Sequence, residues 1–169
     1  FRGEANLQLT VDHAFQVGRY VGWYYGRDHK AKIVIGKDTR RSSYMFEYAL
    51  VAGLTASGAD AYLLHVTTTP SVSYVVRTED FDCGIMISAS HNPFYDNGIK
   101  LLNGNGQKIE AEVEARIEAY LDGRLEKLPY ATREDIGRTV DFASGRNRYI
   151  GYLISVPSCD FKNVKVGVD

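Results

Sequence analysis

The sequence predicts an α/β fold: a layered domain with a mixed, mostly parallel sheet flanked by helices. Three apolar runs, at 32–36, 61–64 and 84–87, are short enough for buried strands. Segments with a helical spacing of apolar residues lie between these runs. This β-α-β-α-β order with short connections is typical of parallel strands joined by crossover helices.

The composition is that of an ordinary globular domain. Of 169 residues, 44% are hydrophobic and 24% charged, and the net charge of −1 favours neither nucleic acid nor anionic lipid as a partner. Two cysteines, Cys83 and Cys159, are too few for a disulfide scaffold. No apolar run reaches the ~20 residues that a membrane span needs. We therefore expect a cytoplasmic protein with no membrane or nucleic-acid partner.

Two helices are predicted in the first half of the chain, one on either side of the first strand. Thr10 is a candidate N-cap for an amphipathic helix that ends near Gly26. After the strand comes a polar loop, 37–43, with three cations and good capping residues. The next helix, 44–57, is expected to stop at Gly58.

A short helix and a hairpin are predicted on either side of the third strand. Thr69 is expected to cap the helix, with Pro70 at its first position. Asn103-Gly104-Asn105-Gly106 is a hairpin signal. It should fold 99–102 back against 107–109 and add an antiparallel element to the sheet.

The last third of the chain is less regular. A helix is predicted at 110–121, followed by a connecting segment at 122–141 that contains glycine and proline. A second helix is expected at 147–154. The closing residues, 164–169, have the apolar character of a strand, so we expect the chain to be part of a longer protein.

The most informative stretch runs from Cys83 to Leu102. Its apolar strand passes directly into the polar sequence SASHNP (88–93), where the proline stops the backbone from continuing as sheet. A second turn signal, DNG (96–98), precedes an apolar run around Lys100. Because α/β proteins commonly place their chemistry where a buried strand ends, this loop is the candidate site.

The residues alone leave three interpretations of the loop open. Ser90 beside His91 suggests a nucleophile, but hydrolase serines lie in a G-x-S-x-G elbow, and this loop has none. A serine bearing phosphate needs cationic and N–H donors, which His91, Asn92 and Lys100 could supply. The third interpretation is a capped turn without chemistry.

The whole run from Gly84 to Lys100 closely resembles the phosphoserine loop of the α-D-phosphohexomutases. In that family the second serine of the motif carries a phosphate, so the match falls on Ser90. Two further segments match as well. Phe1-Arg2-Gly3 resembles the end of the family's G-T-D-G-x-R-G signature, and 36–40 resembles its G-[RK]-D-T-R segment.

The resemblance implies a catalytic role for four residues. Ser90 would donate the phosphoryl group, and its phosphate oxygen would bind Mg²⁺. Lys100 and Arg2 would provide proton transfer and cationic support, while His91 would contact the phosphate. The alternatives are an ordinary strand lysine for Lys100 and a flexible basic terminus for Arg2.

Two more residues would support the phosphate loop. Arg40 matches the family arginine that helps to position the phosphoserine loop, and Asn92 would bind the phosphate or steady the turn. For Arg40 the alternative is a local ion pair with Asp38 that fixes only its own turn.

By the same resemblance, 1–140 is the first domain of a four-domain enzyme, and 141–169 is a linker helix with the first strand of the second domain. Its partners would be the remaining domains of the same enzyme and a small phosphosugar. The implied reaction belongs to amino-sugar activation: glucosamine 6-phosphate and glucosamine 1-phosphate interconvert through glucosamine 1,6-bisphosphate. The alternatives are a mutase of mannose or glucose phosphates in the same family, and a non-catalytic phosphosugar-binding module.

Overall fold

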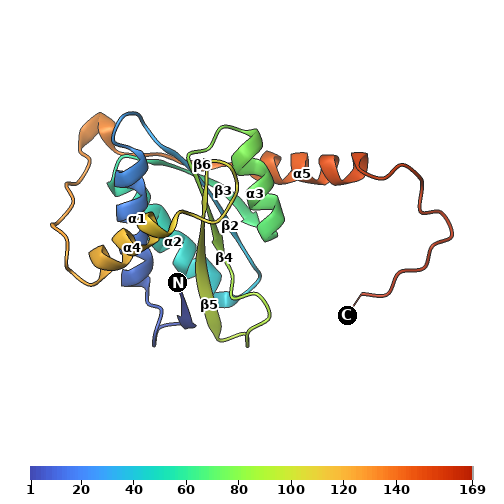
Figure 1. The fold of residues 1–169 in the computed structure, drawn as a ribbon, viewed down its shortest axis with the longest axis horizontal. Helices are drawn as coiled ribbons and strands as arrows, with labels where there is room; N and C mark the ends of the chain where they lie inside the picture. Colours follow the sequence, from blue (N-terminus) through green and yellow to red (C-terminus); the bar gives the residue numbers. More distant parts are fainter. Residues whose placement is uncertain (169) are drawn as a thin grey trace.

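The computed structural model describes residues 1–168 as a six-stranded sheet with helices on both faces (Figure 1). The strands are β1 (Arg2–Glu4), β2 (Lys32–Lys37), β3 (Asp60–Val66), β4 (Cys83–Ile87), β5 (Asp96–Asn103) and β6 (Thr139–Asp141). The helices are α1 (Val11–Tyr25), α2 (Arg41–Ala56), α3 (Thr69–Thr78), α4 (Ala111–Leu121) and α5 (Ala143–Ser155), with a 3₁₀ turn at Arg133–Asp135.

The sheet is mixed and mostly parallel, which confirms the predicted fold class. Its strands lie in the order β1-β5-β4-β2-β3-β6. Strands β2, β3, β4 and β6 run parallel to one another, while β5 is antiparallel to both β4 and β1. The carboxyl ends of the parallel strands therefore meet at one edge of the sheet, and the loops that follow them lie together.

Successive residues of the central strands pack on opposite faces of the sheet, as the two-residue strand period requires. Ile33 and Ile35 of β2 belong to the larger core, which α1, α2 and α4 cover. Val34, between them, belongs to a smaller core under α3. Since both faces are covered, β4 is apolar throughout and β2 is apolar between the lysines at its two ends.

Helices α1 and α2 approach each other closely because glycines lie at their contact. A Cβ atom on Gly53 would lie 2.2 Å from the carbonyl oxygen of Phe15. One on Gly18 would lie 2.5 Å from the carbonyl oxygen of Leu50. Contacts this short are impossible for a side chain, so the separation of the two helices depends on glycine at both positions.

The predicted ends of α1 are confirmed, and those of α2 need one change. The Thr10 hydroxyl caps α1 by accepting from the His13 amide at 3.3 Å, and the helix ends at Gly26. Helix α2 begins at Arg41, three residues before the predicted start. It ends just before Gly58, whose φ of +90° takes the chain out of the helix.

The predicted cap of α3 was wrong by one residue. Thr68, not Thr69, is the N-cap, and its hydroxyl accepts from the Ser71 amide at 3.4 Å. Pro70 is then the second helical residue. Either position suits proline, because neither amide has a partner within the helix.

The antiparallel pairing of β5 also differs from the prediction. Residues 103–106 do form a turn, but 107–109 contribute only an isolated bridge between Leu102 and Lys108. The main partner of β5 is β4, so the serine loop is itself the connection of the hairpin.

The segment after α4 contains a strand that the sequence analysis missed. β6 has only three residues and pairs in parallel with β3 at the sheet edge. Helix α5 begins at Ala143, four residues before its predicted start, and extends away from the sheet (Figure 1). Residues 156–168 form no helix or strand, so the predicted closing strand is not formed there, and residue 169 lies outside the described part.

The predicted division at residue 140 stays a prediction. Within residues 1–168, no helix is long and apolar enough to span a membrane.

Candidate active site

The candidate site is the loop 88–95, which joins β4 to β5 at the carboxyl edge of the sheet. The Ser88 amide donates to the Gly98 carbonyl at 2.9 Å and the Asp96 amide to the Pro93 carbonyl at 3.0 Å. Between these bonds, Ser90 has a φ of +60°, in the left-handed region that costs a non-glycine residue about 1–3 kcal/mol. Contacts from outside the loop must stabilise this conformation.

The two serines of the loop are in different environments. Ser88 is 7% exposed, and its hydroxyl accepts a hydrogen bond from the Ser90 amide at 3.0 Å. Ser90 is exposed, and its hydroxyl oxygen lies 3.3 Å from Nδ1 of His91. Of the two hydroxyl groups, only that of Ser90 is open to a substrate.

Arg40 connects the loop after β2 to the serine loop. Its Nη2 donates to the carbonyl oxygens of Ser90 at 3.1 Å and Asn92 at 2.8 Å. Its Nη1 forms an ion pair with Asp38. Arg40 therefore pairs locally with Asp38 and also contacts the serine loop, and its role in positioning a phosphoserine stays a prediction.

The Asp38 carboxylate is the centre of this arrangement. Burial alone raises the pKa of Asp38, but hydrogen bonds from the Ser43 hydroxyl, the Arg40 amide and Ser88, with the charge of Arg40, hold that pKa below its ordinary value. The Ser43 hydroxyl donates to Oδ1 of Asp38 at 2.7 Å. Asp38 is thus a carboxylate at neutral pH and can anchor the guanidinium of Arg40.

Arg2 lies beside the loop from the other side. It belongs to β1, where it faces Gly98 of β5, so the alternative of a flexible basic terminus is wrong. Its Nη1 donates to Oδ1 of Asn92 at 3.2 Å, and Nδ2 of Asn92 donates to Oδ2 of Asp96 at 3.0 Å. Asn92 therefore links the first strand of the chain to the turn before β5.

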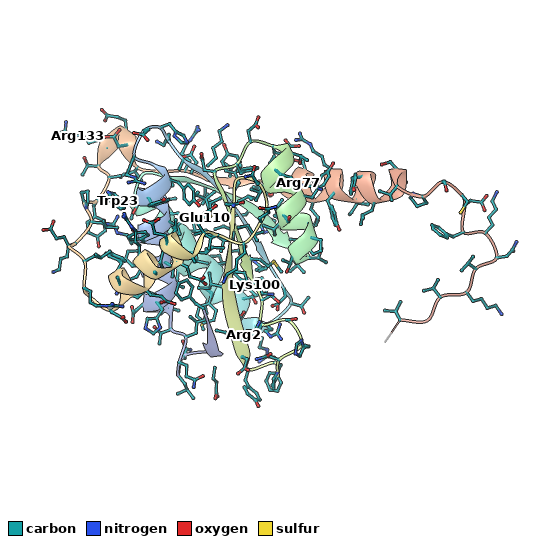
Figure 2. The ribbon with its side chains drawn as sticks, in the orientation of Figure 1. Arg2, Trp23, Arg77, Lys100, Glu110 and Arg133 are labelled. Carbon is teal, nitrogen blue, oxygen red and sulfur yellow. The ribbon has the colours of Figure 1, made fainter. Side chains whose placement is uncertain are left out.

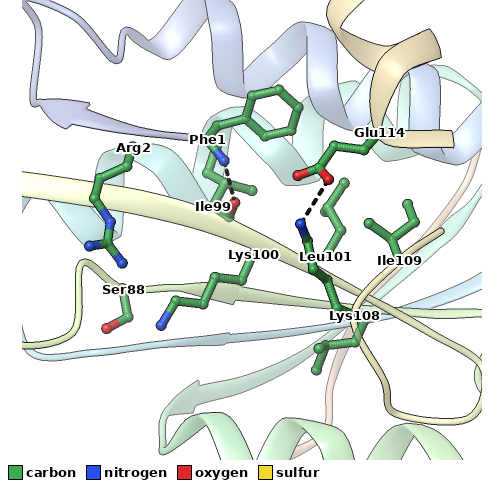
Figure 3. A pocket seen from close by; sticks show the side chains of 10 residues that line it. Phe1, Arg2, Ser88, Ile99, Lys100, Leu101, Lys108, Ile109 and Glu114 are labelled. Carbon is green, nitrogen blue, oxygen red and sulfur yellow. Dashed lines mark hydrogen bonds and ion pairs between the residues drawn. The ribbon is translucent and has the colours of Figure 1, made fainter. Parts of the chain in front are cut away.

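Lys100 lies in β5 opposite Met86 and is half-buried. It lines a cavity of about 340 Å³ together with Arg2, Ser88 and Lys108. The side chains of Arg2 and Lys100 point toward Ser88 in this cavity (Figure 3), and the two residues lie at the same end of the sheet (Figure 2). Two cations thus converge on the base of the serine loop.

The structure therefore brings the predicted site residues together. Hydrogen bonds connect five of them: Ser90, His91, Asn92, Arg40 and Arg2. Lys100 joins them through the cavity, next to Ser88 rather than in contact with Ser90.

Sequence patterns did not reveal the buried polar residues that support the site. Asp38 appeared in them only as the partner of a local ion pair, and Ser43 only as a capping residue. Asn97 was interpreted as a turn residue, but it is fully buried and donates to the hydroxyls of Ser42 at 2.8 Å and Ser43 at 3.1 Å. The sequence offered one sign of a buried role for Asn97: this polar residue lies two positions before the apolar run at 99–102.

The groups around Ser90 are suited to an anion. Arg40, His91 and Asn92 offer positive charge and N–H donors, which fit a phosphate on the serine. Among residues 1–168 no three His, Cys, Asp or Glu side chains lie close enough together to hold a metal ion.

Residues 1–127 match the family model of phosphoglucomutase/phosphomannomutase, alpha/beta/alpha domain I, and the chain belongs to that family. Among curated relatives, it is 74% identical over 172 residues to the phosphoglucosamine mutase of Lachnospira eligens and 71% identical over 169 residues to that of Lachnoclostridium phytofermentans. Each alignment covers 100% of this chain but only 38% of the relative, so the chain spans well under half of their length.

Solved structures agree with the fold. A putative phosphomannomutase from Thermus thermophilus superimposes with a TM-score of 0.74 at 26% identity, over 92% of this chain and 34% of that one. A phosphoglucomutase/phosphomannomutase family protein from Burkholderia thailandensis gives the same TM-score at 22% identity, over the same shares of the two chains. The α/β domain is thus the common element.

Proposed function

We propose that the whole protein is a phosphosugar mutase that interconverts glucosamine 6-phosphate and glucosamine 1-phosphate, and that this chain supplies the phosphoryl donor. The observation that carries the proposal is the exposed Ser90 hydroxyl in a loop held by Arg40 and Arg2. The high identity to phosphoglucosamine mutases over the whole chain supports the amino-sugar substrate.

In the proposed reaction, phosphorylated Ser90 transfers its phosphoryl group to a sugar hydroxyl. The bond from phosphorus to Oγ of Ser90 breaks, a bond to the sugar oxygen forms, the sugar hydroxyl proton passes to a base, and the leaving Oγ of Ser90 takes up a proton to become a hydroxyl. The bisphosphorylated sugar then returns its other phosphate to Ser90, which restores the phosphoserine. Such a transfer depends on in-line placement and on neutralisation of charge.

The residues of this chain have separate tasks in that transfer. Arg2 and Lys100 provide cationic support, and Lys100 is the candidate for proton transfer at the sugar hydroxyl. His91, with Nδ1 3.3 Å from Oγ of Ser90, contacts the phosphate. Arg40 and Asn92 hold the loop in place. Mg²⁺ bound to a phosphoserine oxygen would offset negative charge, and its other ligands would come from outside this chain.

A small phosphorylated substrate and two unpaired cysteines fit a reducing compartment, so we place the protein in the cytoplasm.

A comparison of substrates with the purified full-length protein tests the assignment. With Mg²⁺ and a bisphosphate primer, kcat/KM should be higher for glucosamine 6-phosphate than for glucose 6-phosphate or mannose 6-phosphate. The matched control is the Ser90→Ala variant, which should turn over none of them. A preference for glucose or mannose phosphate would instead support the phosphoglucomutase/phosphomannomutase alternative, and binding without turnover would support a binding module.

The 169-residue chain alone should fold but not catalyse. It has a hydrophobic core on each face of the sheet, yet its described residues contain no group of three His, Cys, Asp or Glu side chains that could hold a metal ion. We expect a cooperative thermal transition and no detectable turnover of glucosamine 6-phosphate. Clear activity of this chain would contradict the proposal that residues outside it are needed for the reaction.

A further inference from the structure

Both backbone groups of Ser90 are held by side chains. Its amide donates to the Ser88 hydroxyl at 3.0 Å, and its carbonyl oxygen accepts from Nη2 of Arg40 at 3.1 Å. The other terminal nitrogen of Arg40 pairs with Asp38, and Ser88 is among the groups that lower the pKa of that carboxyl. The Arg40 contact to Ser90 thus leads back to the Asp38 carboxylate.

Asp38 is itself held in position by hydrogen bonds of its backbone and its side chain. Its amide donates to the carbonyl of Ile87, the last residue of β4, at 3.0 Å, which ties the end of β2 to the start of the serine loop. Its Oδ1 accepts from the Arg40 amide at 3.1 Å and the Ser43 hydroxyl at 2.7 Å. The side chains of Asp38 and Arg40 are only 18% and 13% exposed, so water competes weakly for these bonds.

Asn97 orients the serine that supports Asp38. The Ser43 hydroxyl has a single hydrogen, which it gives to Asp38, so it can accept the hydrogen bond from Nδ2 of Asn97 at 3.1 Å. The Asn97 side chain is fixed in turn, because its Oδ1 accepts from the Gly98 amide at 2.8 Å. The Gly98 carbonyl accepts from the Ser88 amide, so this hydrogen-bond network also includes the first residue of the serine loop.

We propose that Asp38 is a positioning residue for phosphoryl transfer, which holds Ser90 in its left-handed backbone conformation through Arg40, with Ser43 and Asn97 fixing Asp38 in turn. Asp38 touches neither phosphate nor sugar in this role. It sets the direction of the Ser90 Oγ atom, and in-line transfer is sensitive to that direction: a misplacement of about 1 Å can cost about 10²-fold in rate. The kinetic part rests on the proposed mutase function.

The test is Asp38→Asn in the full-length protein, with Asp60→Asn as the matched control. Asp60 is also buried, and it accepts from the Arg138 amide at 2.8 Å and from the guanidinium of the more exposed Arg138 side chain at 3.1 Å. It lies at the opposite end of the parallel strands from the serine loop. Both variants lose an ion pair with an arginine, but only the arginine paired with Asp38 also contacts Ser90.

We expect Asp38→Asn to lower kcat by about 10²-fold, with KM for glucosamine 6-phosphate within threefold of wild type. Asp60→Asn should leave both constants within threefold. A kcat for Asp38→Asn within threefold of that of Asp60→Asn would overturn the proposal. An equal loss of kcat in both variants would also overturn it, because the loss would then reflect reduced stability and not the position of Ser90.

A measurement without substrate separates this proposal from the proposed function. Amide hydrogen exchange in a peptide spanning 88–95 should be faster in Asp38→Asn than in wild type, and unchanged in Asp60→Asn. Ser43→Ala, which removes the hydroxyl between Asn97 and Asp38, should act in the same direction and remains informative if Asp38→Asn fails to fold. Unchanged exchange in Ser43→Ala and in a folded Asp38→Asn protein would refute the positioning role, whatever reaction the protein catalyses.

Discussion

The guanidinium of Arg40 donates a hydrogen bond to the carbonyl oxygen of Ser90, fifty residues further along the chain, at 3.1 Å. The contact joins the loop after β2 to the loop after β4, two neighbouring parallel strands. It brings a guanidinium, which is paired with Asp38, next to the serine that we propose carries phosphate. The same side chain thus contributes to the conformation of the loop and to its electrostatic field.

Ser90, and not Ser88, should carry the phosphate in the full-length protein purified from cells. Ser88 is 7% exposed and its hydroxyl already accepts from the Ser90 amide, whereas the Ser90 hydroxyl is open to solvent. Intact-mass and fragment-ion analysis should locate one phosphate on Ser90. The matched variants are Ser90→Ala, which should lose the phosphate, and Ser88→Ala, which should retain it. Phosphate on Ser88 would contradict the assignment.

Replacing Lys100 by alanine should lower kcat by about 10²–10⁴-fold, the usual contribution of a general acid or base. Because Lys100 is half-buried and has no ion-pair partner among the described residues, the melting temperature should change little. Lys108→Ala is the control: Lys108 lines the same cavity but is paired with Glu114 at 2.9 Å. We expect it to keep kcat within threefold. Equal effects of the two variants on kcat would remove Lys100 from the chemistry.

Gly53→Ala should destabilise the fold by about 1–3 kcal/mol, the usual cost of forcing extra atoms into a packed site. Its new methyl group would lie 2.2 Å from the Phe15 carbonyl oxygen, so α1 and α2 would have to separate. Gly151→Ala in α5 is the control, because nothing lies within 4 Å of its added Cβ atom. That change should be neutral or slightly stabilising, since alanine favours helix over glycine. Urea unfolding measures both, and equal stability of the two variants would argue against close helix packing.

The ion pair of Asp38 should make stability depend on pH in the acid range. The folded chain holds the pKa of Asp38 below its ordinary value, so the carboxylate stabilises the fold above the unfolded pKa of about 3.9. This contribution is lost as the pH falls through the folded pKa. The difference in melting temperature between wild type and Asp38→Asn should therefore be constant from about pH 7 to pH 5 and decrease below about pH 4. A difference that stays constant down to pH 3 would show that the pKa of Asp38 is not lowered.

The sequence by itself determined the local features of this protein. The apolar runs at 32–36, 61–64 and 84–87 are strands because their composition and length leave few alternatives, and both faces of these strands are covered as predicted. The polar loop at 88–93 follows from the same reasoning, because Pro93 stops the strand within a few residues. Family membership could also be predicted there, since the motif is continuous in the chain.

Only the tertiary structure decided which distant residues meet. β1 could not be predicted as a partner of β5, nor β6 as a partner of β3, because strands of three residues have no periodicity of their own and form only beside an existing sheet edge. The contacts of Asn97 with Ser43 and of Arg40 with Ser90 depend in the same way on strand order. A buried polar side chain must find its hydrogen-bond partner in three dimensions, and residue spacing along the chain does not specify that partner.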